Sequence, residues 1–559
     1  GAFAAYTSAL TFAEGRHTIL YRAVDNVANI ETVQTLQIQS DATPPASSLA
    51  IGSPSFDPGS GQPVFVAAAT LLSLSAQDPV VQNVASGVRQ ISFRRGGDAF
   101  AAYAAPFALA LPDGLKTLDY FATDNVGNQE VNRSTAVALD ASAPMTSLAV
   151  LGGRQFPGST STSFYASADT RYALPAVDPV VGGVASGLAL TQWQDNSGAF
   201  QSFSAAFGLA EGSHLLAYQS QDRVLNLEVP RSTTVLVDAT PPVSSALIGA
   251  PTFTASDGAI YIAPATPVTL SAVDPALPTG QLGSGLNRIE VAIDGGNFSA
   301  YSSALTFAEG RHTILYRAID NVANVEGVRT LQVRSDATPP VSSLVVGEPQ
   351  FQLPSVLLVS TRTFFSIAPV DPNVNNVASG VKDTSFRVSD TTPGTAAFSA
   401  FTAPFTVAGA DINKVIEFFS RDNVLNAEVV KSSTVLLDST SPEVALLSPA
   451  SCGAGICRVL KGKFPVFGVV RDLHFGDYRL EFASGQDASI GFTLISSGTL
   501  AVSSGTLGMW DATALAGWFT VRLTAADLVA NTAAITLNVF VGDPGQLMVL
   551  GNHEVFNMP

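Results

Sequence analysis

Short runs in which apolar and polar residues alternate dominate this chain. In 288–294 (RIEVAID) every second residue is apolar, and 312–320 (HTILYRAID) alternates in the same way. A period of two places one set of side chains on a buried face, which predicts half-buried strands. The Gly-Gly pair at 295–296 predicts a hairpin turn after the first run. No segment carries a sustained helical stripe, so the sequence predicts an all-β fold.

The predicted strands belong to internal repeats of about 100 residues, marked by three motifs in fixed order. The first motif is seen in 316–324 (YRAIDNVAN), the second is the linker 336–340 (DATPP), and the third is 371–380 (DPNVNNVASG), in which Asp-Pro precedes Ser-Gly. Residues 8–23 match 303–318 without a change. The chain therefore opens inside a repeat, and we expect the natural polypeptide to continue upstream.

About seven short strands in 100 residues are typical of an immunoglobulin-like sandwich. We therefore predict an all-β tandem array of immunoglobulin-like β-sandwich domains that forms an elongated rod. The predicted parts are a C-terminal half domain at 1–41, full domains at 42–140, 141–238, 239–336 and 337–438, a divergent domain at 439–541, and a linker or the start of a following module at 542–559.

The motifs also carry a resemblance to a known group of proteins. The string Tyr-x-Ala-x-Asp-x-x-x-Asn-x-Glu, followed by a strand and Asp-Ala-Thr-Pro-Pro, resembles the tandem immunoglobulin-like repeats of large bacterial surface and adhesin-like proteins. Those repeats usually read Asp-x-Ala-Gly-Asn, whereas this chain keeps the glycine only at Gly127. The resemblance covers 1–438, and 439–541 looks like a relative of another branch. It implies an exported, extracellular protein of a bacterial cell surface.

The polar motif residues are expected to meet at one end of each sandwich, because the B–C loop, the F–G loop and the start of strand A share that end. A glutamate two residues past the motif asparagine is expected to join four of these sets or their neighbours: Glu130, Glu228, Glu326 and Glu428. A fifth set, Asp438, Asp472, Asp527 and Asn531, lacks the Ser-Gly step. The four full sets are Asp41, Asp78, Asp124 and Asn128; Asp140, Asp178, Asp222 and Asn226; Asp238, Asp274, Asp320 and Asn324; and Asp336, Asp371, Asp422 and Asn426.

Two kinds of chemistry fit these sets. Three crowded carboxylates repel one another unless they are protonated, separated or bridged by a cation, and Ca²⁺ takes about 6–8 oxygen ligands of this kind. The first hypothesis is a structural calcium site that stiffens each joint between domains. The second is that each aspartate caps its own turn by accepting backbone N–H groups and needs no metal. The pattern alone leaves both open.

Other chemistry-bearing residues point to structural roles. His17, His214 and His312 share a repeat position that Lys116 and Lys414 take elsewhere, so we predict a solvated turn and neither a catalytic residue nor a metal ligand. No nucleophile elbow, zinc-protease motif or phosphate-binding loop occurs in the sequence, which argues against an enzyme.

The two cysteines and the first tryptophan are also interpreted structurally. Cys452 and Cys457 enclose a short Gly-rich loop, which predicts a local disulfide in an oxidising compartment. A metal pair is the rival, but two cysteines with no nearby histidine make an incomplete zinc set. Trp193 is expected to pack in a core, with a sugar platform as the alternative.

Composition excludes several classes of protein. The chain is 46% apolar and only 13% charged, which excludes a disordered chain. No run of about 18 apolar residues occurs, so no membrane-spanning helix is predicted. The net charge of −17 argues against nucleic acid and anionic membranes as partners and suits a protein that binds divalent cations.

These observations predict a non-enzymatic extracellular structural protein: a stalk, spacer or fibre subunit on a bacterial cell surface, and a piece of a longer polypeptide. It would self-associate into fibres or meet a cell-surface partner. One alternative is a ligand-binding adhesin for glycan or protein, with 439–541 and its Trp510 and Trp518 as the best candidate region. The other is an accessory region of a large secreted enzyme. Leu547, Val549 and Phe556 are expected to pack on a following domain or a partner.

Overall fold

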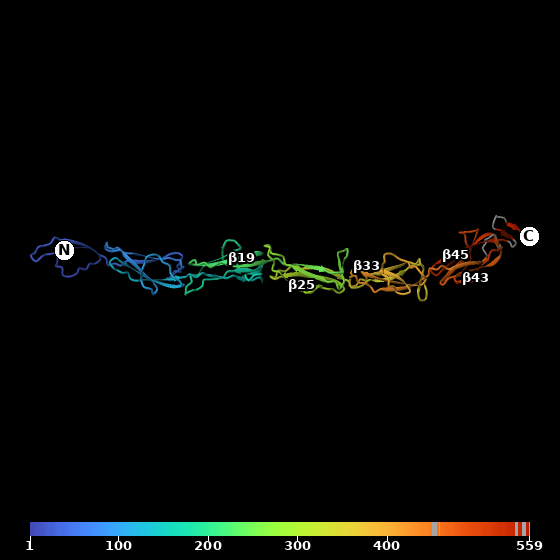
Figure 1. Ribbon diagram of the computed structural model, residues 1–559, viewed down its shortest axis with the longest axis horizontal. Helices are drawn as coiled ribbons and strands as arrows, with labels where there is room; N and C mark the ends of the chain where they lie inside the picture. The colour runs from blue at the N-terminus through green and yellow to red at the C-terminus, as the bar shows by residue number, and fades with distance from the viewer. Residues whose placement is uncertain (450–455, 458, 543–545, 550–554, 558–559) are drawn as a thin grey trace. The chain divides into compact units, whose positions relative to one another are not determined.

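The computed structural model describes residues 1–449, 456–457, 459–542, 546–549 and 555–557 (Figure 1). Every regular element within these residues is a β-strand, so the all-β prediction is confirmed. The described residues form no helix with the length and apolar character of a membrane span. Cys452 lies outside the described residues, so the Cys452–Cys457 disulfide stays a prediction.

Contacts between residues divide the chain into two compact units. The first unit comprises Gly1–Ser244, Ala272–Glu290 and Arg317–Gly327, and the second comprises Ser245–Ser271, Val291–Tyr316 and Val328–Pro559. The seven parts predicted from the repeats stay a prediction. We keep the predicted ranges as names: repeat 1 is 42–140, repeat 2 is 141–238, repeat 3 is 239–336, repeat 4 is 337–438 and the final repeat is 439–541.

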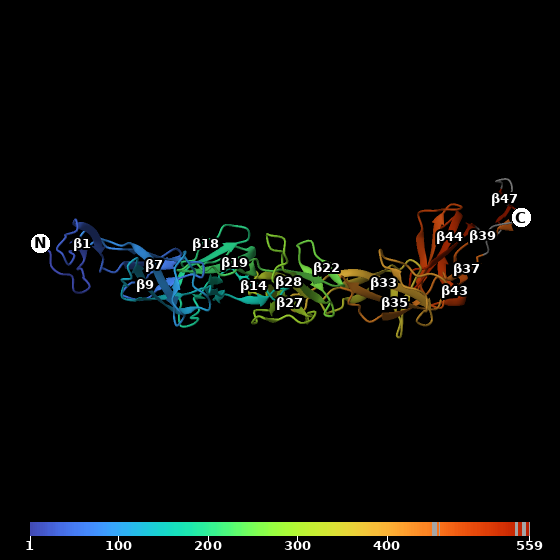
Figure 2. The same cartoon turned by 60° about the vertical axis from the view of Figure 1, so that its left-hand side comes forward.

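Repeat 1, in the first unit, is a sandwich of a six-stranded and a two-stranded sheet. The larger sheet has the order β4-β5-β10-β9-β7-β8, and the smaller sheet pairs β3 with β6. Strand β5 lies parallel to β10, whereas β9 is antiparallel to both β10 and β7. Figure 2 shows β7 and β9 side by side. The strands are β3 (Ala46–Ile51), β4 (Ser55–Phe56), β5 (Val64–Val66), β6 (Leu72–Gln77), β7 (Val88–Arg95), β8 (Ala101–Ala102), β9 (Gly114–Asp124) and β10 (Arg133–Leu139).

The same strand order recurs in repeats 2, 3 and 4, so the chain is a tandem array of immunoglobulin-like sandwiches. The larger sheets are β13-β14-β20-β19-β17-β18, β22-β23-β28-β27-β25-β26 and β30-β31-β36-β35-β33-β34. The smaller sheets are β11-β16 and β12-β15 in repeat 2, β21-β24 in repeat 3 and β29-β32 in repeat 4.

The bounds of these strands follow the repeat closely. In repeat 2 they are β11 (Met145–Thr146), β12 (Ala149–Leu151), β13 (Gln155–Pro157), β14 (Ser163–Ser167), β15 (Arg171–Ala173), β16 (Ala176–Val177), β17 (Leu188–Asp195), β18 (Gln201–Ser202), β19 (Gly212–Asp222) and β20 (Arg231–Asp238). In repeat 3 they are β21 (Val243–Ile248), β22 (Thr252–Thr254), β23 (Ile260–Ile262), β24 (Val268–Val273), β25 (Leu286–Ile293), β26 (Ser299–Ala300), β27 (Gly310–Asp320) and β28 (Arg329–Ser335). In repeat 4 they are β29 (Val341–Val346), β30 (Gln350–Gln352), β31 (Leu357–Val359), β32 (Phe365–Val370), β33 (Val381–Asp390), β34 (Ser399–Ala400), β35 (Asn413–Asp422) and β36 (Lys431–Leu437).

Alternation along the strands builds the core of each sandwich. In β9 the buried residues Leu118, Tyr120 and Ala122 are separated by single residues, as a period of two requires. Leu118 packs in a cluster with Leu72 of the smaller sheet and Val137 of the neighbouring strand, so both sheets contribute to one core. Burial of each such side chain stabilises the fold by about 1.5–3 kcal/mol.

The strand that follows the Ser-Gly step begins with a bulge in several repeats. The register against the neighbouring strand shifts between Val88 and Gln90 in repeat 1, between Leu188 and Leu190 in repeat 2, and between Val381 and Asp383 in repeat 4. A bulge re-aims the chain at the end of a sheet. The polar motif residues lie at this end of each sandwich.

The final repeat, in the second unit, is a sandwich with different sheets. They are β37-β40-β43 and β39-β45-β44-β41-β42, and β38-β46-β47 form a further small sheet. Trp510 is buried in the core with Phe519, so it is not exposed for a ligand. The strands are β37 (Glu443–Ser448), β38 (Ile456–Cys457), β39 (Val459–Leu460), β40 (Lys463–Arg471), β41 (Phe475–Ser484), β42 (Thr493–Gly498), β43 (Val502–Asp511), β44 (Gly517–Asp527), β45 (Thr532–Val541), β46 (Gln546–Val549) and β47 (Val555–Asn557).

At the other end, 1–41 contributes the antiparallel pair β1 (Gly15–Tyr21) and β2 (Gln34–Ser40). Tyr21 is half exposed here, whereas Tyr316, at the same repeat position, is buried. The sequence is nearly the same, so the difference in exposure comes from the partner strands that 239–336 supplies and 1–41 does not.

Candidate metal centres at the starts of the repeats

The structure brings together three aspartates at the start of each of four repeats. In every set one carboxylate oxygen from each residue lies within 4.8 Å of the others. One aspartate comes from the linker, one from the B–C loop and one from the F–G turn, as the sequence predicts. The groups are Asp41, Asp78 and Asp124; Asp140, Asp178 and Asp222; Asp238, Asp274 and Asp320; and Asp336, Asp371 and Asp422.

The F–G aspartate of each set caps its own turn, as the metal-free hypothesis expects. In repeat 4, Oδ1 of Asp422 accepts the backbone N–H groups of Val424 at 2.9 Å and Asn426 at 2.8 Å. The side-chain amide of Asn426 donates to Oδ2 of Asp422 at 2.7 Å and to the carbonyl of Asp336 at 2.8 Å. The amide nitrogen therefore ties the F–G turn to the linker. Asn128, Asn226 and Asn324 make the same pair of contacts.

The Ser-Gly step supplies one backbone donor to each of the other two aspartates. In repeat 4, Ser379 N–H donates to Oδ2 of Asp336 and Gly380 N–H donates to Oδ2 of Asp371, both at 2.6 Å. Gly380 has a φ of +87°, which residues with a Cβ adopt only at a cost. The glycine of the motif is therefore required by the backbone that presents these two donors.

Capping leaves other oxygens of each set without a partner. Oδ1 of Asp371 and Oγ of Ser379 are buried and, among the described residues, have no hydrogen-bond partner. Ser379 is only 5% exposed, and its own amide is bound to Asp336, so the hydroxyl is held at the carboxylates. Buried polar atoms without partners are rare and costly. The same atoms are unpartnered in Asp78, in Asp178 and Ser186, and in Asp274 and Ser284.

Burial and mutual repulsion raise the pKa values of these carboxyls. Burial raises the pKa of Asp371 to about 6, and the nearby carboxylates of Asp336 and Asp422 contribute. Burial, with repulsion from Asp238 and Asp320, also raises the pKa of Asp274 to about 6. Neutral or cation-bound carboxyls are therefore favoured in both sets.

In the first set, hydrogen bonds outweigh the effect of burial on the pKa of the F–G aspartate. Burial would raise the pKa of Asp124, but hydrogen bonds from Asn128 and Gly127 lower it overall. Asp41 is half buried, whereas Asp140, Asp238 and Asp336 are fully buried.

The residues of the four sets fit a hard divalent cation. Their unpartnered atoms are carboxylate and hydroxyl oxygens, the ligands that Ca²⁺ prefers. The described residues form five groups that could hold a metal ion, and an imidazole belongs only to the fifth, Asp438, Asp472 and His474. A cation would supply the missing partner for the orphaned oxygens and neutralise the crowded carboxylates. Turn capping explains the F–G aspartate but not the unpartnered atoms of Asp371 and Ser379.

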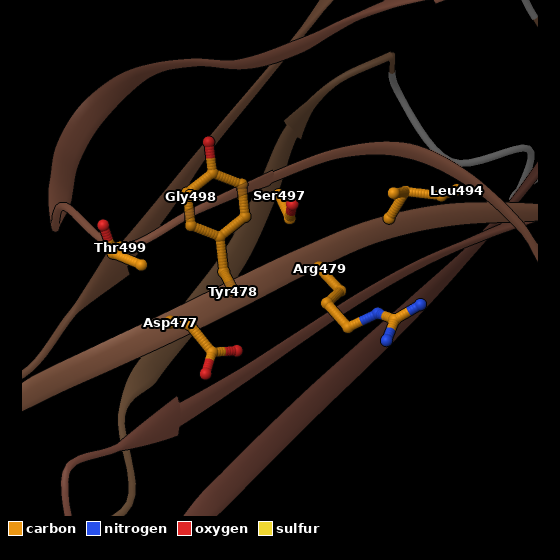
Figure 3. Close-up of a pocket in the computed structure, with 7 residues that line it drawn as sticks. All are labelled: Asp477, Tyr478, Arg479, Leu494, Ser497, Gly498 and Thr499. Atoms are coloured by element: carbon orange, nitrogen blue, oxygen red, sulfur yellow. The ribbon is translucent and has the colours of Figure 1, made fainter.

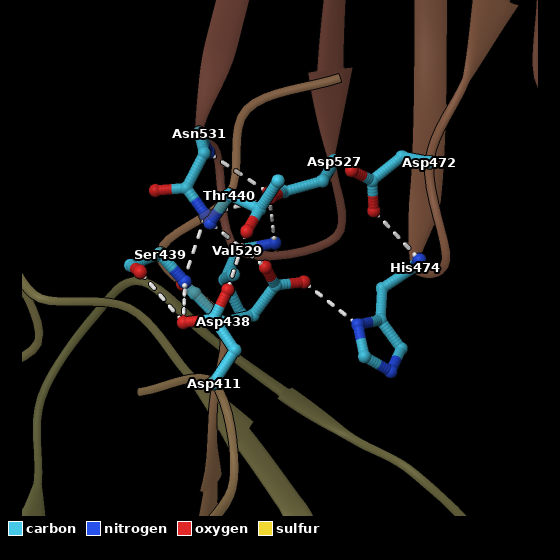
Figure 4. A network of polar contacts seen from close by, with 9 residues as sticks. All are labelled: Asp411, Asp438, Ser439, Thr440, Asp472, His474, Asp527, Val529 and Asn531. Atoms are coloured by element: carbon cyan, nitrogen blue, oxygen red, sulfur yellow. Dashed lines mark hydrogen bonds and ion pairs between the residues drawn. The ribbon is translucent and has the colours of Figure 1, made fainter. Parts of the chain in front are cut away.

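The fifth set is built differently (Figure 4). The B–C loop is shortened to Asp472–His474, and Nδ1 of His474 lies 2.7 Å from Oδ2 of Asp438, the position that the Ser-Gly amide takes in the other sets. The backbone N–H of His474 donates to Asp472 at 2.7 Å. The imidazole therefore lies at the linker carboxylate.

Two expectations about the neighbouring residues are wrong. Glu130 does not join its aspartates: it is buried against the first strand, where it accepts the amide of Ser47 at 2.9 Å and its hydroxyl at 2.5 Å. Glu228, Glu326 and Glu428 do the same with Thr146, Ser244 and Ser342.

The position shared by histidine and lysine is also not a solvated turn. His214 lies within β19 and is 9% exposed, and Lys414 lies within β35 and is 2% exposed. Nδ1 of His214 is 2.8 Å from Asp195, and Nζ of Lys414 is 2.6 Å from Asp390. The position provides a side-chain nitrogen that contacts an acid on the adjacent strand, and neither residue belongs to the aspartate sets.

An acidic residue just before the F strand was missed. Glu14, Asp113, Glu211 and Glu309 each precede a glycine at this turn, and Asp411 lies close to the same place. Each accepts a hydrogen bond from the linker that follows its own repeat: Thr43 to Glu14 at 2.6 Å, Ser142 to Asp113 at 2.7 Å, Thr240 to Glu211 at 2.5 Å, Thr338 to Glu309 at 2.9 Å and Thr440 to Asp411 at 2.5 Å. We call these residues the turn acids. The sequence signal that could have identified these residues is an acidic residue followed by glycine, which recurs about every 98 residues.

A pocket of about 520 Å³ in the final repeat does not form a convergent site (Figure 3). Tyr478 projects from one face of β41, and Asp477 and Arg479 project from the other. The Tyr478 hydroxyl donates to the carbonyl of Leu507 at 2.8 Å, and Arg479 binds Glu481 at 3.1 Å. The Tyr478 hydroxyl and the Arg479 guanidinium are therefore committed to partners within the fold. Trp193 stacks on Phe207 at 3.7 Å between ring centroids, which confirms its packing against a core.

No family model and no curated protein matches the chain. Among solved structures, it is similar to a tetra-tandem repeat in the extending region of a large adhesion protein, with 16% identity over 89% of this chain and 100% of that one and a TM-score of 0.19. It is also similar to the protocadherin gammaB4 extracellular domain (11% identity, 94% and 89% covered, TM-score 0.23) and to fibronectin(III)-like modules of CbhA from Clostridium thermocellum (13%, 34% and 94%, 0.20). Identities and TM-scores this low support no functional argument, so the function is argued from the residues of this chain alone.

Proposed function

We propose that this chain is a non-enzymatic, extracellular structural spacer of a surface or adhesion-like protein, and that Ca²⁺ stiffens the joints between its repeats. As first inferred from the sequence motifs, we place it among the tandem immunoglobulin-like repeats of large bacterial surface proteins. It would hold another part of the polypeptide at a distance or take part in a fibre.

The observation that carries this proposal is the recurrence of one oxygen set at four joints. Each set combines crowded carboxylates with the buried, unpartnered Oδ1 of its B–C aspartate, as in Asp371. A catalytic or ligand-specific site is normally unique in a chain, whereas a structural device is repeated wherever the same joint is repeated. Recurrence therefore supports a spacer over a catalyst or a single-site adhesin.

The joints also carry apolar contacts that a cation would consolidate. In the second unit, Tyr261 of repeat 3 clusters with Val377 and Val424 of repeat 4, both of which are buried. Val377 belongs to the B–C loop and Val424 to the F–G turn, the two segments that also hold Asp371 and Asp422. Fixing these segments with a cation would fix the apolar surface that they present to the preceding repeat.

Chelation tests the proposal on the full chain. Saturating Ca²⁺ is expected to raise the melting temperature and to narrow the spread of conformations seen by small-angle X-ray scattering, because a ligand that binds only the folded state stabilises it. Excess chelator should reverse both effects, and Mg²⁺ at the same concentration should act more weakly because it demands stricter geometry. Identical melting and scattering curves with Ca²⁺ and with chelator would refute the proposal.

A further inference from the structure

The B–C loops of repeats 1, 2 and 4 each end in a small hairpin. In repeat 4, the backbone N–H groups of Val374 and Val377 donate to each other's carbonyls at 3.0 and 2.8 Å. Asn375 and Asn376 lie between them with φ values of +51° and +59°, and two consecutive left-handed residues form a type I′ turn. The corresponding tip residues, all with left-handed φ values, are Gln82 and Asn83 in repeat 1 and Gly182 and Gly183 in repeat 2.

The tip of repeat 4 contacts repeat 3 at the turn that leads into β27. The side-chain amide of Asn375 donates to the carbonyl of Glu309 at 3.4 Å, and Nε of Arg311 donates to the carbonyl of Asn376 at 3.2 Å. All four residues belong to the second unit. Hydrogen bonds therefore run in both directions between the tip and the turn.

Other atoms make the contact where repeat 3 meets repeat 2, within the first unit. The B–C loop of repeat 3 is longer, and Oγ1 of its Thr279 accepts the backbone N–H of Ser213, at the start of β19, at 3.1 Å. The Tyr165 hydroxyl of repeat 2 donates to the carbonyl of Leu282 in the same loop at 3.3 Å. The B–C loop thus meets the same turn of the preceding repeat, but through different groups.

Where repeat 2 meets repeat 1, the contact is a close approach of two backbones. A Cβ on Gly182 would lie 2.2 Å from the carbonyl oxygen of Asp113, which is closer than Cβ atoms come to backbone, whereas a Cβ on Gly183 would have no atom within 4 Å. Asparagine and glutamine take the position of Gly182 in repeats 4 and 1, so the type I′ turn itself does not require glycine. Glycine at 182 therefore fits this tip to the turn of repeat 1.

The turn in 1–41 is a natural comparison for the turn of repeat 3. Residues 13–17 and 308–312 have the same sequence, AEGRH, but they meet different tips. Oε1 of Gln82 lies 2.9 Å from the point that a Cβ on Gly15 would occupy. The side chain of Arg16 makes no hydrogen bond within the described part of the chain, whereas Arg311 binds the tip of repeat 4. Identical turns thus make different contacts because the tips differ.

The final joint makes its contact through another loop. Its B–C loop is shortened to Asp472–His474, and Arg362 of repeat 4 contacts the F–G turn of the final repeat instead. Its guanidinium donates to the carbonyl of Val529 at 3.4 Å and to that of Ala530. Loss of the long B–C loop is therefore accompanied by a different connection between the two repeats.

We propose that the B–C loop of each of repeats 1 to 4 docks on the turn before the F strand of the preceding repeat, and that loop and turn are matched at each joint. In tandem arrays, stability is the sum of terms for single repeats and for contacts between neighbours, so this docking couples each repeat to its predecessor. Protein atoms alone form the contact, so it goes beyond the proposed function and does not depend on the cation. A tip residue moved to another joint fits worse than its own.

Hydrogen–deuterium exchange on the full chain, in chelator, measures the contact in one repeat after a change in its neighbour. Arg311→Ala, in repeat 3, should accelerate exchange at 374–377 of repeat 4 by about three- to tenfold, because the tip loses a charged donor. Arg16→Ala removes the same residue from the identical turn and should change exchange at 81–84 by less than about twofold. Unchanged exchange at 374–377 in Arg311→Ala, or equal acceleration at the two tips, would overturn the inference.

Two substitutions within one tip separate the fit between repeats from the strain of the turn. Gly182→Asn and Gly183→Asn each introduce, at a left-handed position, the residue that repeat 4 carries there. Only the Cβ at 182 meets the backbone of repeat 1, so Gly182→Asn should accelerate exchange at 113–118 by about fivefold or more, and Gly183→Asn by less than about twofold. Equal exchange at 113–118 in the two variants would overturn the matching of loop and turn.

Discussion

Acidification is expected to release Ca²⁺ from the joints that open repeats 3 and 4. The pKa values of Asp274 and Asp371 are about 6, so each carboxyl is mostly ionised at pH 7 and about 90% protonated at pH 5. A proton and a cation compete for the same carboxylate. The apparent Ca²⁺ affinity of each of these two joints should therefore fall about tenfold between pH 7 and pH 5.

The same groups give the cation-free protein the opposite pH dependence. Their folded pKa values lie above the value of about 3.9 for an unfolded aspartate, so the unfolded state releases these protons first as the pH rises. The stabilising contribution is complete below about pH 4 and is lost as the pH rises through about 6. With chelator, the melting temperature should therefore rise between pH 7 and pH 5, whereas with subsaturating Ca²⁺ it should fall.

Calorimetric Ca²⁺ titrations and thermal unfolding at pH 5, 6 and 7 check both signs. Asp371→Asn should remove the pH dependence of Ca²⁺ affinity at the joint that opens repeat 4. The pH dependence at the joint that opens repeat 3 should remain. Equal Ca²⁺ affinities at pH 5 and pH 7, or melting temperatures that change in the same direction with and without Ca²⁺, would refute the reasoning from crowded carboxyls.

Three further predictions concern single side chains. Glu428→Gln should lower the unfolding free energy by about 2–4 kcal/mol, because the buried carboxylate accepts several hydrogen bonds, whereas the exposed Glu443→Gln should change it by less than about 0.5 kcal/mol in the same denaturant titration. His214→Lys should keep the melting temperature within a few degrees, since other repeats carry lysine there, and His214→Ala should lower it by leaving Asp195 without its hydrogen-bond partner. Asp222→Ala should abolish Ca²⁺-dependent exchange protection at 178–187 while leaving that at 371–380 unchanged; loss at both loops would contradict independent joints.

Most of the fold, and the convergence of the aspartates, could be predicted from the repeated sequence motifs. Alternation in 312–320 predicted a strand that the structure contains in β27, and the spacing of Asp336, Asp371 and Asp422 predicted their convergence. These predictions succeeded because a period of two fixes the face of a side chain and the sandwich topology fixes which loops share an end.

The parts that failed depend on contacts between segments that no local pattern encodes. Glu130 follows the motif directly, but its partner Ser47 is 83 residues away on the first strand. His214 was assigned to a solvated turn because lysine replaces it, yet both residue types place a side-chain nitrogen against an acid on the adjacent strand. Glu309 acts on a linker and loop of the following repeat, so its role emerges only when two repeats are considered together.

The number of Ca²⁺ ions bound by the full chain at pH 7 tests the central claim most directly. Equilibrium dialysis with metal analysis should give four per chain, one for each joint that combines three aspartates with the unpartnered B–C aspartate oxygen. Each of Asp78→Asn, Asp178→Asn, Asp274→Asn and Asp371→Asn should reduce the number by one. A chain that binds no Ca²⁺ above background, or whose bound Ca²⁺ is unaffected by all four substitutions, would contradict the account.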